Sequence, residues 1–328
     1  MLLASFAAAF LAMVVVLVVV WAWWQGDPND AQRSRGVNAL WAAHTWVGDR
    51  HTDAEYEDFA RLLTTNEISD VFFHAGPLEG DGTVPADRIE HAGELVAAME
   101  RYASEVRVQA YLGQIERRGG GPLDLDDDDV RGHIVATASQ FLDLGFDGIH
   151  YDIEPIYPGD ESFLDLLDRT HDLTQRHGAV LSVAVEQLEV VPGAQRVISV
   201  FLRDYHDPTK EYLRQVAARS DQVAIMTYDT GLPAAWLFGA YMARETERVI
   251  DAIGGDVVVF MGVPTYEDGS SLRFHPRSEN MRSGIRGVRK GLDGLGRERT
   301  ENVGVAIFAE WTTSDDEWAA YAADWLRN

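Results

Sequence analysis

Residues 145–155 read GFDGIHYDIEP, a strand-like segment with two acids one strand period apart, Asp152 and Glu154. Alternate side chains of a strand point to the same face, so His150, Asp152 and Glu154 should lie together. Two carboxylates on one buried face repel, so the pKa of one should rise and keep it protonated near neutral pH. A proton donor beside an anion is what the cleavage of an acetal requires. The alternative is a strand end whose acids cap loops or bind a metal.

This segment is one of eight strand-like stretches that alternate with helix-like stretches along the chain. They are nearly continuous apolar runs, which is typical of a parallel sheet covered on both faces. Eight such units predict a (β/α)8 TIM barrel of the α/β class, with a doubly wound open sheet as the alternative. The strand-like stretches are residues 36–44, 69–76, 106–113, 146–154, 179–186, 221–229, 256–264 and 303–311. Amphipathic helical patterns include 52–63, 161–178 and 315–328, and the acidic run 126–129 should begin another helix.

Polar and aromatic residues stand where these strands end. The functional residues of such barrels lie at the carboxyl ends of the strands, so we expect a site at that end. Besides Glu154, the residues found there are His44, Trp46, His74, Tyr111, Gln114, Glu186, Tyr228, Asp229, Tyr266 and Trp311.

Residues 147–154, DGIHYDIE, resemble the D-G-x-D-x-D-x-E signature of glycoside hydrolase family 18, the chitinase-like enzymes. The match covers Asp147, Gly148, Asp152 and Glu154. It departs at His150, where the family has its second Asp. In the family that Asp shares a proton network with the third Asp, a part that a neutral His150 could take by a hydrogen bond to Asp152.

Two further segments resemble the same family, in the same order along the chain. Met226-Thr227-Tyr228-Asp229 matches the M-x-Y-D segment of the sixth strand, and Ala309-Glu310-Trp311 stands where the family places the Trp that floors a sugar subsite. The S-x-G-G segment of strand three is missing, and Tyr111-Leu112-Gly113-Gln114 stands in its place. The resemblance therefore implies a divergent member of the family.

The resemblance also implies roles for individual residues. Glu154 would protonate the leaving oxygen and then activate water, while the substrate's own 2-acetamido oxygen attacks the anomeric carbon. Asp152 would orient that acetamido group, and Tyr228 would donate a hydrogen bond to its carbonyl. Further contacts to the sugar are expected from Asp229, Trp311, His150, Met226, Tyr111, Glu186 and Tyr266. Asp147, on the opposite strand face, and Gly148 are expected to be structural.

Two other functions stay open at this stage. One is a non-catalytic carbohydrate-binding barrel, which the change at His150 favours and the intact pair of Asp152 and Glu154 opposes. The other is a glycosidase whose nucleophile is a protein carboxylate. Glu186 or Asp229 would then face Glu154 at about 5 Å for retention or about 6.5–9.5 Å for inversion.

The composition excludes several classes of partner. The chain has 328 residues and a net charge of −25, which disfavours binding to nucleic acid. The absence of cysteine excludes disulfides and thiolate metal sites, and the ten histidines show no H-E-x-x-H spacing. We expect no metal and no cofactor. The low lysine content, Lys210 and Lys290 alone, suits a halophilic host, and a GC-rich genome is the alternative explanation.

The N-terminal segment Met1–Trp24 has no charged side chain and exceeds the roughly 20 residues that cross a bilayer as a helix. It predicts an uncleaved membrane anchor, because no A-x-A-like cleavage site follows; a cleaved signal peptide is the alternative. Residues 25–35 read as a linker and 36–328 as the barrel domain. A cell-membrane location with the barrel outside is inferred from the expected polysaccharide or oligosaccharide substrate. Arg33 and Arg35 after the segment argue mildly against export.

Overall fold

The structure is a computed structural model that describes residues 2–188, 209–267 and 274–326, with side chains of the first helix described from Phe10 onward. Eight parallel strands pair in chain order, and β1 pairs with both β2 and β8, so the sheet is a closed barrel. The predicted (β/α)8 barrel is confirmed, and the open sheet is excluded. The strands are β1 Asn38–Ala42, β2 Asp70–His74, β3 Arg107–Ile115, β4 Gly148–Glu154, β5 Val180–Glu186, β6 Gln222–Met226, β7 Val258–Pro264 and β8 Val303–Phe308.

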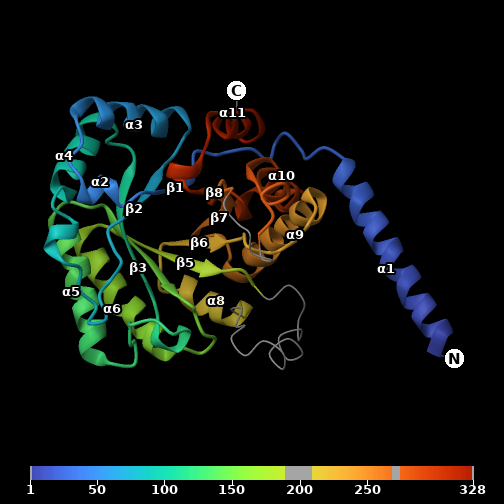
Figure 1. The fold of residues 1–328 in the computed structure, drawn as a ribbon, viewed down its shortest axis with the longest axis horizontal. Helices are drawn as coiled ribbons and strands as arrows, with labels where there is room; N and C mark the ends of the chain where they lie inside the picture. The colour runs from blue at the N-terminus through green and yellow to red at the C-terminus, as the bar shows by residue number, and fades with distance from the viewer. Residues whose placement is uncertain (1, 189–208, 268–273, 327–328) are drawn as a thin grey trace.

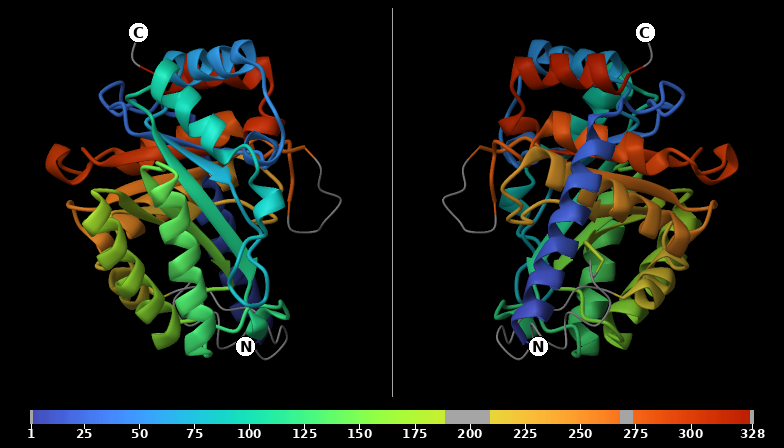
Figure 2. Two further views of the ribbon diagram at one scale, coloured as in Figure 1. Left: turned by 90° about the vertical axis from the view of Figure 1, so that its left-hand side faces the viewer. Right: turned by 90° about the vertical axis from the view of Figure 1, so that its right-hand side faces the viewer.

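Helices surround the barrel, as Figures 1 and 2 show. The α-helices are α1 Leu2–Gln25, α2 Thr45–Gly48, α3 Asp53–Thr65, α4 Ala92–Tyr102, α5 Asp128–Asp143, α6 Glu161–His177, α8 Lys210–Ala217, α9 Ala235–Ile253, α10 Met281–Leu292 and α11 Asp315–Asp324. Short 3-10 helices are η1 Ala86–Arg88, η2 Arg117–Gly119, η3 Arg297–Arg299 and η4 Glu310–Thr312. Each predicted strand and each predicted helix contains an observed element. β3 extends to Ile115, two residues beyond its predicted end, and so brings more side chains to the carboxyl end of the barrel.

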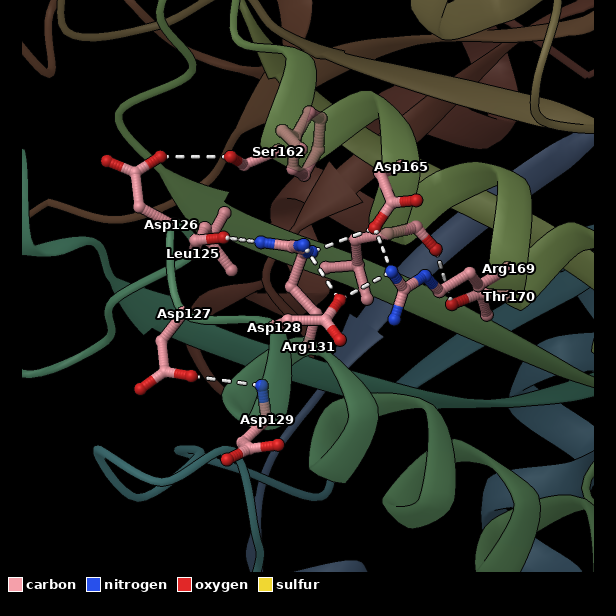
Figure 3. A network of polar contacts seen from close by, with 12 residues as sticks. Leu125, Asp126, Asp127, Asp128, Asp129, Arg131, Ser162, Asp165, Arg169 and Thr170 are labelled. Carbon is pink, nitrogen blue, oxygen red and sulfur yellow. Dashed lines mark hydrogen bonds and ion pairs between the residues drawn. The ribbon is translucent and has the colours of Figure 1, made fainter.

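The acidic run at residues 126–129 begins α5, as predicted, and Figure 3 shows the polar contacts around it. The Asp127 side chain caps the helix by accepting from the backbone N–H of Asp129 at 2.9 Å. Arg131 on α5 donates to Asp165 on α6 at 2.8 Å, and Arg169 on α6 donates to Asp128 at 2.6 Å. These charged pairs connect two neighbouring helices that cover the barrel.

The interior of the barrel is filled in layers along its axis. At the amino ends of the strands, Asp70 accepts from Arg107 at 2.7 Å, from Gln109 at 2.8 Å and from Gln222 at 2.9 Å. Above this polar layer, the large rings of Trp41, Phe72 and Phe260 pack with small side chains of neighbouring strands, Ala39, Ala224 and Ala306. The carboxyl end of the barrel thus rests on a filled core, and its loops carry the candidate site.

Helix α1 spans the apolar N-terminal segment and lies beside α9 (Figures 1 and 2). Its last turn is fixed to α10, where Lys290 donates to the Trp23 carbonyl at 3.0 Å and Arg286 to the Trp24 carbonyl at 2.9 Å. Among the described residues, no helix has the length and apolar character needed to cross a membrane. The membrane anchor predicted at residues 1–24 therefore has no support from the structure.

Candidate active site

Strand β4 carries the central acids of the site, and its first residues fix its place in the barrel. The Asp147 carboxylate accepts from the Val108 N–H of β3 at 2.8 Å, which ties the start of β4 to its neighbour. A Cβ at Gly148 would lie 2.6 Å from the Val180 side chain on β5 and 2.7 Å from its carbonyl oxygen, so the strand pairing requires glycine there. These contacts fit the structural roles expected for both residues.

Asp152 is held from one side only. The Tyr111 hydroxyl on β3 donates to its Oδ2 at 2.6 Å. Its other oxygen, Oδ1, is buried and has no hydrogen-bond partner among the described residues. Burial raises the pKa of Asp152, and the bond from Tyr111 opposes that rise. A buried acceptor without a partner costs free energy, which a hydrogen-bond donor from a ligand would recover.

Glu154 lies one strand period further along β4, half-buried at the mouth of the barrel. Burial, followed by the negative charges of Asp152, Glu186 and Asp229, raises its pKa from 4.5 to about 8. The carboxyl can therefore keep its proton at neutral pH and donate it. This rise has the direction that the sequence predicts for one acid of the pair.

The three acids around Glu154 each have a hydrogen-bond donor. Tyr111 donates to Asp152, the Ile156 N–H donates to Glu186 at 3.2 Å, and Tyr266 donates to Asp229 at 2.6 Å. Within the described ranges no donor of the protein reaches the Glu154 carboxyl. A donor to a carboxylate favours its ionised form, and Glu154 receives none of these bonds.

His150 lies below the site and is fully buried. The Trp41 indole N–H donates to its Nε2 at 3.1 Å, which leaves the proton on Nδ1, where it points to the Ser182 hydroxyl at 2.9 Å. The ring stacks on Phe72 with centroids 3.7 Å apart. Burial lowers its pKa to about 3, so it is neutral. The expectations that His150 contacts a sugar and can bond Asp152 are corrected, because it has no access to the surface and both nitrogens are engaged elsewhere.

Tyr228 and Asp229 follow β6 and close another side of the site. Tyr228 is 8% exposed, and its ring stacks on Phe308 at 5.3 Å. Burial and the negative charges of Asp152 and Glu154 raise its pKa well above 10, so its hydroxyl remains a donor. Asp229 has a backbone φ of 59°, a left-handed conformation that is uncommon for residues other than glycine.

A buried carboxylate holds the loop that follows Asp229. Glu279, before α10, accepts from the backbone N–H groups of Thr230 and Gly231 at 3.0 Å each. Glu279 was not predicted from the sequence, and neither were Trp41 and Ser182, which bind His150 beneath the site. No motif marks these residues, since each acts on a partner far away in the chain.

A pocket of about 340 Å³ opens at Tyr111, the residue that donates to Asp152. Trp311 lines it and is 51% exposed, which fits an apolar floor for a sugar ring and not a core residue. Tyr111 borders both this pocket and Asp152, while Met226 is half-buried at the end of β6. The pocket is lined by Ala43, His44, His74, Tyr111, Phe308 and Trp311.

Among the described residues, no group of three or more His, Asp or Glu side chains is placed to hold a metal ion.

Comparison with known proteins supports the fold. No protein-family model matches the chain, and no curated protein matches it. Among solved structures, the spore cortex-lytic enzyme SleL of Bacillus megaterium matches with a TM-score of 0.61 and 13% identity, over 90% of this chain and 75% of that one. A class V chitinase of Pseudomonas fluorescens matches with a TM-score of 0.59 and 14% identity, over 88% of this chain and 98% of that one.

A chitinase of Chromobacterium violaceum gives a similar result, with a TM-score of 0.58, 14% identity and coverage of 89% of this chain and 99% of that one. At such low identities the likeness defines the fold alone. The chain is a (β/α)8 barrel of the shape that these enzymes have, so the fold implied by the resemblance to glycoside hydrolase family 18 is confirmed.

Proposed function

We propose that the protein is a glycoside hydrolase that cleaves a glycan containing N-acetylhexosamine, with retention and with the substrate's acetamido group as nucleophile. The observation that carries the proposal is the pair on β4: Glu154 has a raised pKa and no donor within the described residues, while Asp152 beside it offers an unpartnered oxygen. The chitinases and the cortex-lytic enzyme that share the fold support a carbohydrate substrate.

The first step of the proposed reaction breaks the glycosidic bond. Glu154 donates its proton to the leaving oxygen as the bond to the anomeric carbon breaks, and the acetamido carbonyl oxygen attacks that carbon. The product is a cyclic oxazolinium ion and the released alcohol. Asp152 Oδ1 accepts the acetamido N–H and faces the positive charge that forms, and the Tyr228 hydroxyl donates to the carbonyl before the attack.

The second step returns the enzyme to its starting state. The Glu154 carboxylate takes a proton from water, and the resulting hydroxyl oxygen attacks the anomeric carbon from the side that the leaving group vacated. The ring opens to restore the acetamido group, and Glu154 is protonated again. Two displacements give net retention.

Turnover of defined substrates by the full-length protein tests this proposal. N-acetylated oligosaccharides should be hydrolysed, while their de-N-acetylated counterparts and a plain glucan should not. A thiazoline mimic of the cyclic intermediate should inhibit strongly, since ligands that resemble a transition state bind more tightly than substrates.

Each remaining alternative predicts a different outcome in this experiment. If the protein hydrolyses a plain glucan and the thiazoline does not inhibit it, the nucleophile is a protein carboxylate and not the acetamido group. Binding of oligosaccharides without any turnover would make the protein a carbohydrate-binding barrel. The predicted location at the cell membrane, with the barrel outside, stays a prediction that fractionation of cells tests.

A further inference from the structure

Tyr111 reaches Asp152 because of how β3 and β4 are paired. In the register of the two strands, Tyr111 stands opposite His150, and Gly113 stands opposite Asp152. The Tyr111 side chain must therefore lean along β3, over residue 113, to bring its hydroxyl 2.6 Å from Asp152 Oδ2. Its hydroxyl thus lies two positions further along the strands than its own backbone.

Gly113 makes room for that reach. A Cβ at position 113 would lie 2.8 Å from Cε2 of the Tyr111 ring, closer than such atoms approach in proteins. Any side chain at Gly113 would push the ring away from Asp152. The hydrogen bond from β3 to Asp152 therefore depends on two residues of β3, Tyr111 and Gly113.

His150 does not hydrogen-bond Asp152. Both ring nitrogens of His150 are engaged with Trp41 and Ser182, below the site. In the family that the β4 segment resembles, an acid at this position shares a proton network with the following acid. In this chain the donor to Asp152 comes from β3 instead.

We propose that Tyr111 is the positioning residue of Asp152, which fixes its carboxylate so that Oδ1 meets the acetamido group of the substrate. This inference rests on the proposed function and deepens it. In the signature that residues 147–154 resemble, the second Asp interacts with the third. In this chain Tyr111, on the neighbouring strand β3, makes that interaction with Asp152 instead.

A phenol in this place has a consequence for the pH dependence. A carboxylic acid that shares a proton with Asp152 would titrate with it, whereas burial and the charge of Asp152 raise the pKa of Tyr111 well above 10. The bond from Tyr111 hence persists over the working range and offsets part of the rise that burial causes in the pKa of Asp152. Among the described residues, the other titratable groups that face this pair are Glu154 and His150 on β4, Tyr228 after β6 and His74 on β2. Burial lowers the pKa of His74 to about 4 and that of His150 to about 3, so both rings are neutral.

The experiment is Tyr111→Phe in the full-length protein, which removes the hydroxyl and keeps the ring. We expect kcat to fall about 10- to 100-fold, the range for a hydrogen bond to a charged group, with KM nearly unchanged. The acidic limb of the pH profile should move up by about one pH unit, because Asp152 loses the bond that favours its ionised form. The basic limb, set by Glu154, should stay in place.

Tyr151→Phe is the matched control. Tyr151 is a fully buried phenol on β4, next to Asp152, and its hydroxyl contacts the Thr170 hydroxyl on α6 at 2.9 Å. Its loss should lower the melting temperature and leave both limbs of the pH profile unchanged. A merely structural role for Tyr111 would give that same pattern in Tyr111→Phe.

The outcomes separate the inference from the proposed function. A wild type that hydrolyses N-acetylated oligosaccharides, with a Tyr111→Phe variant that keeps its kcat and acidic limb, overturns the inference alone. If only KM rises in Tyr111→Phe, Tyr111 acts by contacting the sugar and not by positioning Asp152, and the inference is overturned. A wild type without any turnover overturns the proposed function, and the inference with it.

Discussion

Replacing Glu154 with Gln should make the protein more stable at alkaline pH while it removes catalysis. The pKa of Glu154 is about 8 in the folded protein, against 4.5 for the free side chain. Between these values the unfolded chain has lost the proton that the folded protein keeps, so folding becomes less favourable as pH rises from 4.5 to 8. The full difference corresponds to about 5 kcal/mol, at about 1.4 kcal/mol for each pH unit.

Gln has nearly the same shape as Glu and does not ionise, so the variant escapes this penalty. We expect its free energy of unfolding to exceed that of the wild type by up to about 5 kcal/mol at pH 9. The two proteins should converge near pH 4.5. Urea unfolding at half-unit steps between pH 4.5 and 9 measures the difference, in which the groups that do not interact with Glu154 cancel.

The same variant tests the role of Glu154 in the reaction. General acid–base assistance contributes about 10²- to 10⁴-fold, so kcat should fall by that factor while the thiazoline ligand still binds. An aryl glycoside with a very acidic leaving group needs little protonation, and its first step should fall much less than that of a natural oligosaccharide. A variant with more than half the wild-type rate, or a stability difference that does not change with pH, would refute the assignment of Glu154.

Four further outcomes are expected. Asp152→Asn removes a negative charge that raises the pKa of Glu154, so the basic limb of kcat/KM should move below pH 8 as the rate falls; an unmoved limb would contradict the coupling. Trp311→Ala should raise KM about tenfold without a change in melting temperature, because the ring is 51% exposed, and a drop in melting temperature would place it in the core. Gly148→Ala should cost about 1–3 kcal/mol in urea unfolding, against no loss for Gly132→Ala, whose added Cβ meets nothing within 4 Å. With a net charge of −25, the melting temperature should climb as KCl rises to molar concentration, and a flat response would remove the halophilic interpretation.

The barrel could be predicted from the sequence because its signals are local. Each strand is a short apolar run between an amphipathic helix and a polar turn, and eight such units admit few arrangements. The acid pair on β4 could also be predicted, since the two-residue period of a strand places Asp152 and Glu154 on one face. The helix at the acidic run followed from the preference of helix starts for negative charge.

The partners of these acids could not be predicted, because they depend on how neighbouring strands are staggered. The prediction gave Tyr111 a contact with the sugar, but the register that sends its hydroxyl to Asp152 appears only in the paired strands. His150 was expected at the surface of the site because it shares a face with Asp152. That face runs down into the barrel, so a residue one period earlier lies beneath the site, where Trp41 and Ser182 bind it.

The negative charges around Glu154 serve both halves of the proposed reaction. Before bond cleavage, Asp152, Glu186 and Asp229 raise the pKa of Glu154 and so keep the proton in place for the leaving oxygen. Once that proton has left, the substrate carries the positive charge of the oxazolinium ion, and the same carboxylates stabilise it across a short, partly buried distance. Glu154 itself becomes an anion surrounded by anions, which makes it a strong base toward water. The carboxylates around Glu154 therefore destabilise the fold but favour each step of the proposed reaction. They favour protonation of the leaving group, then stabilise the cation, and then favour removal of a proton from water.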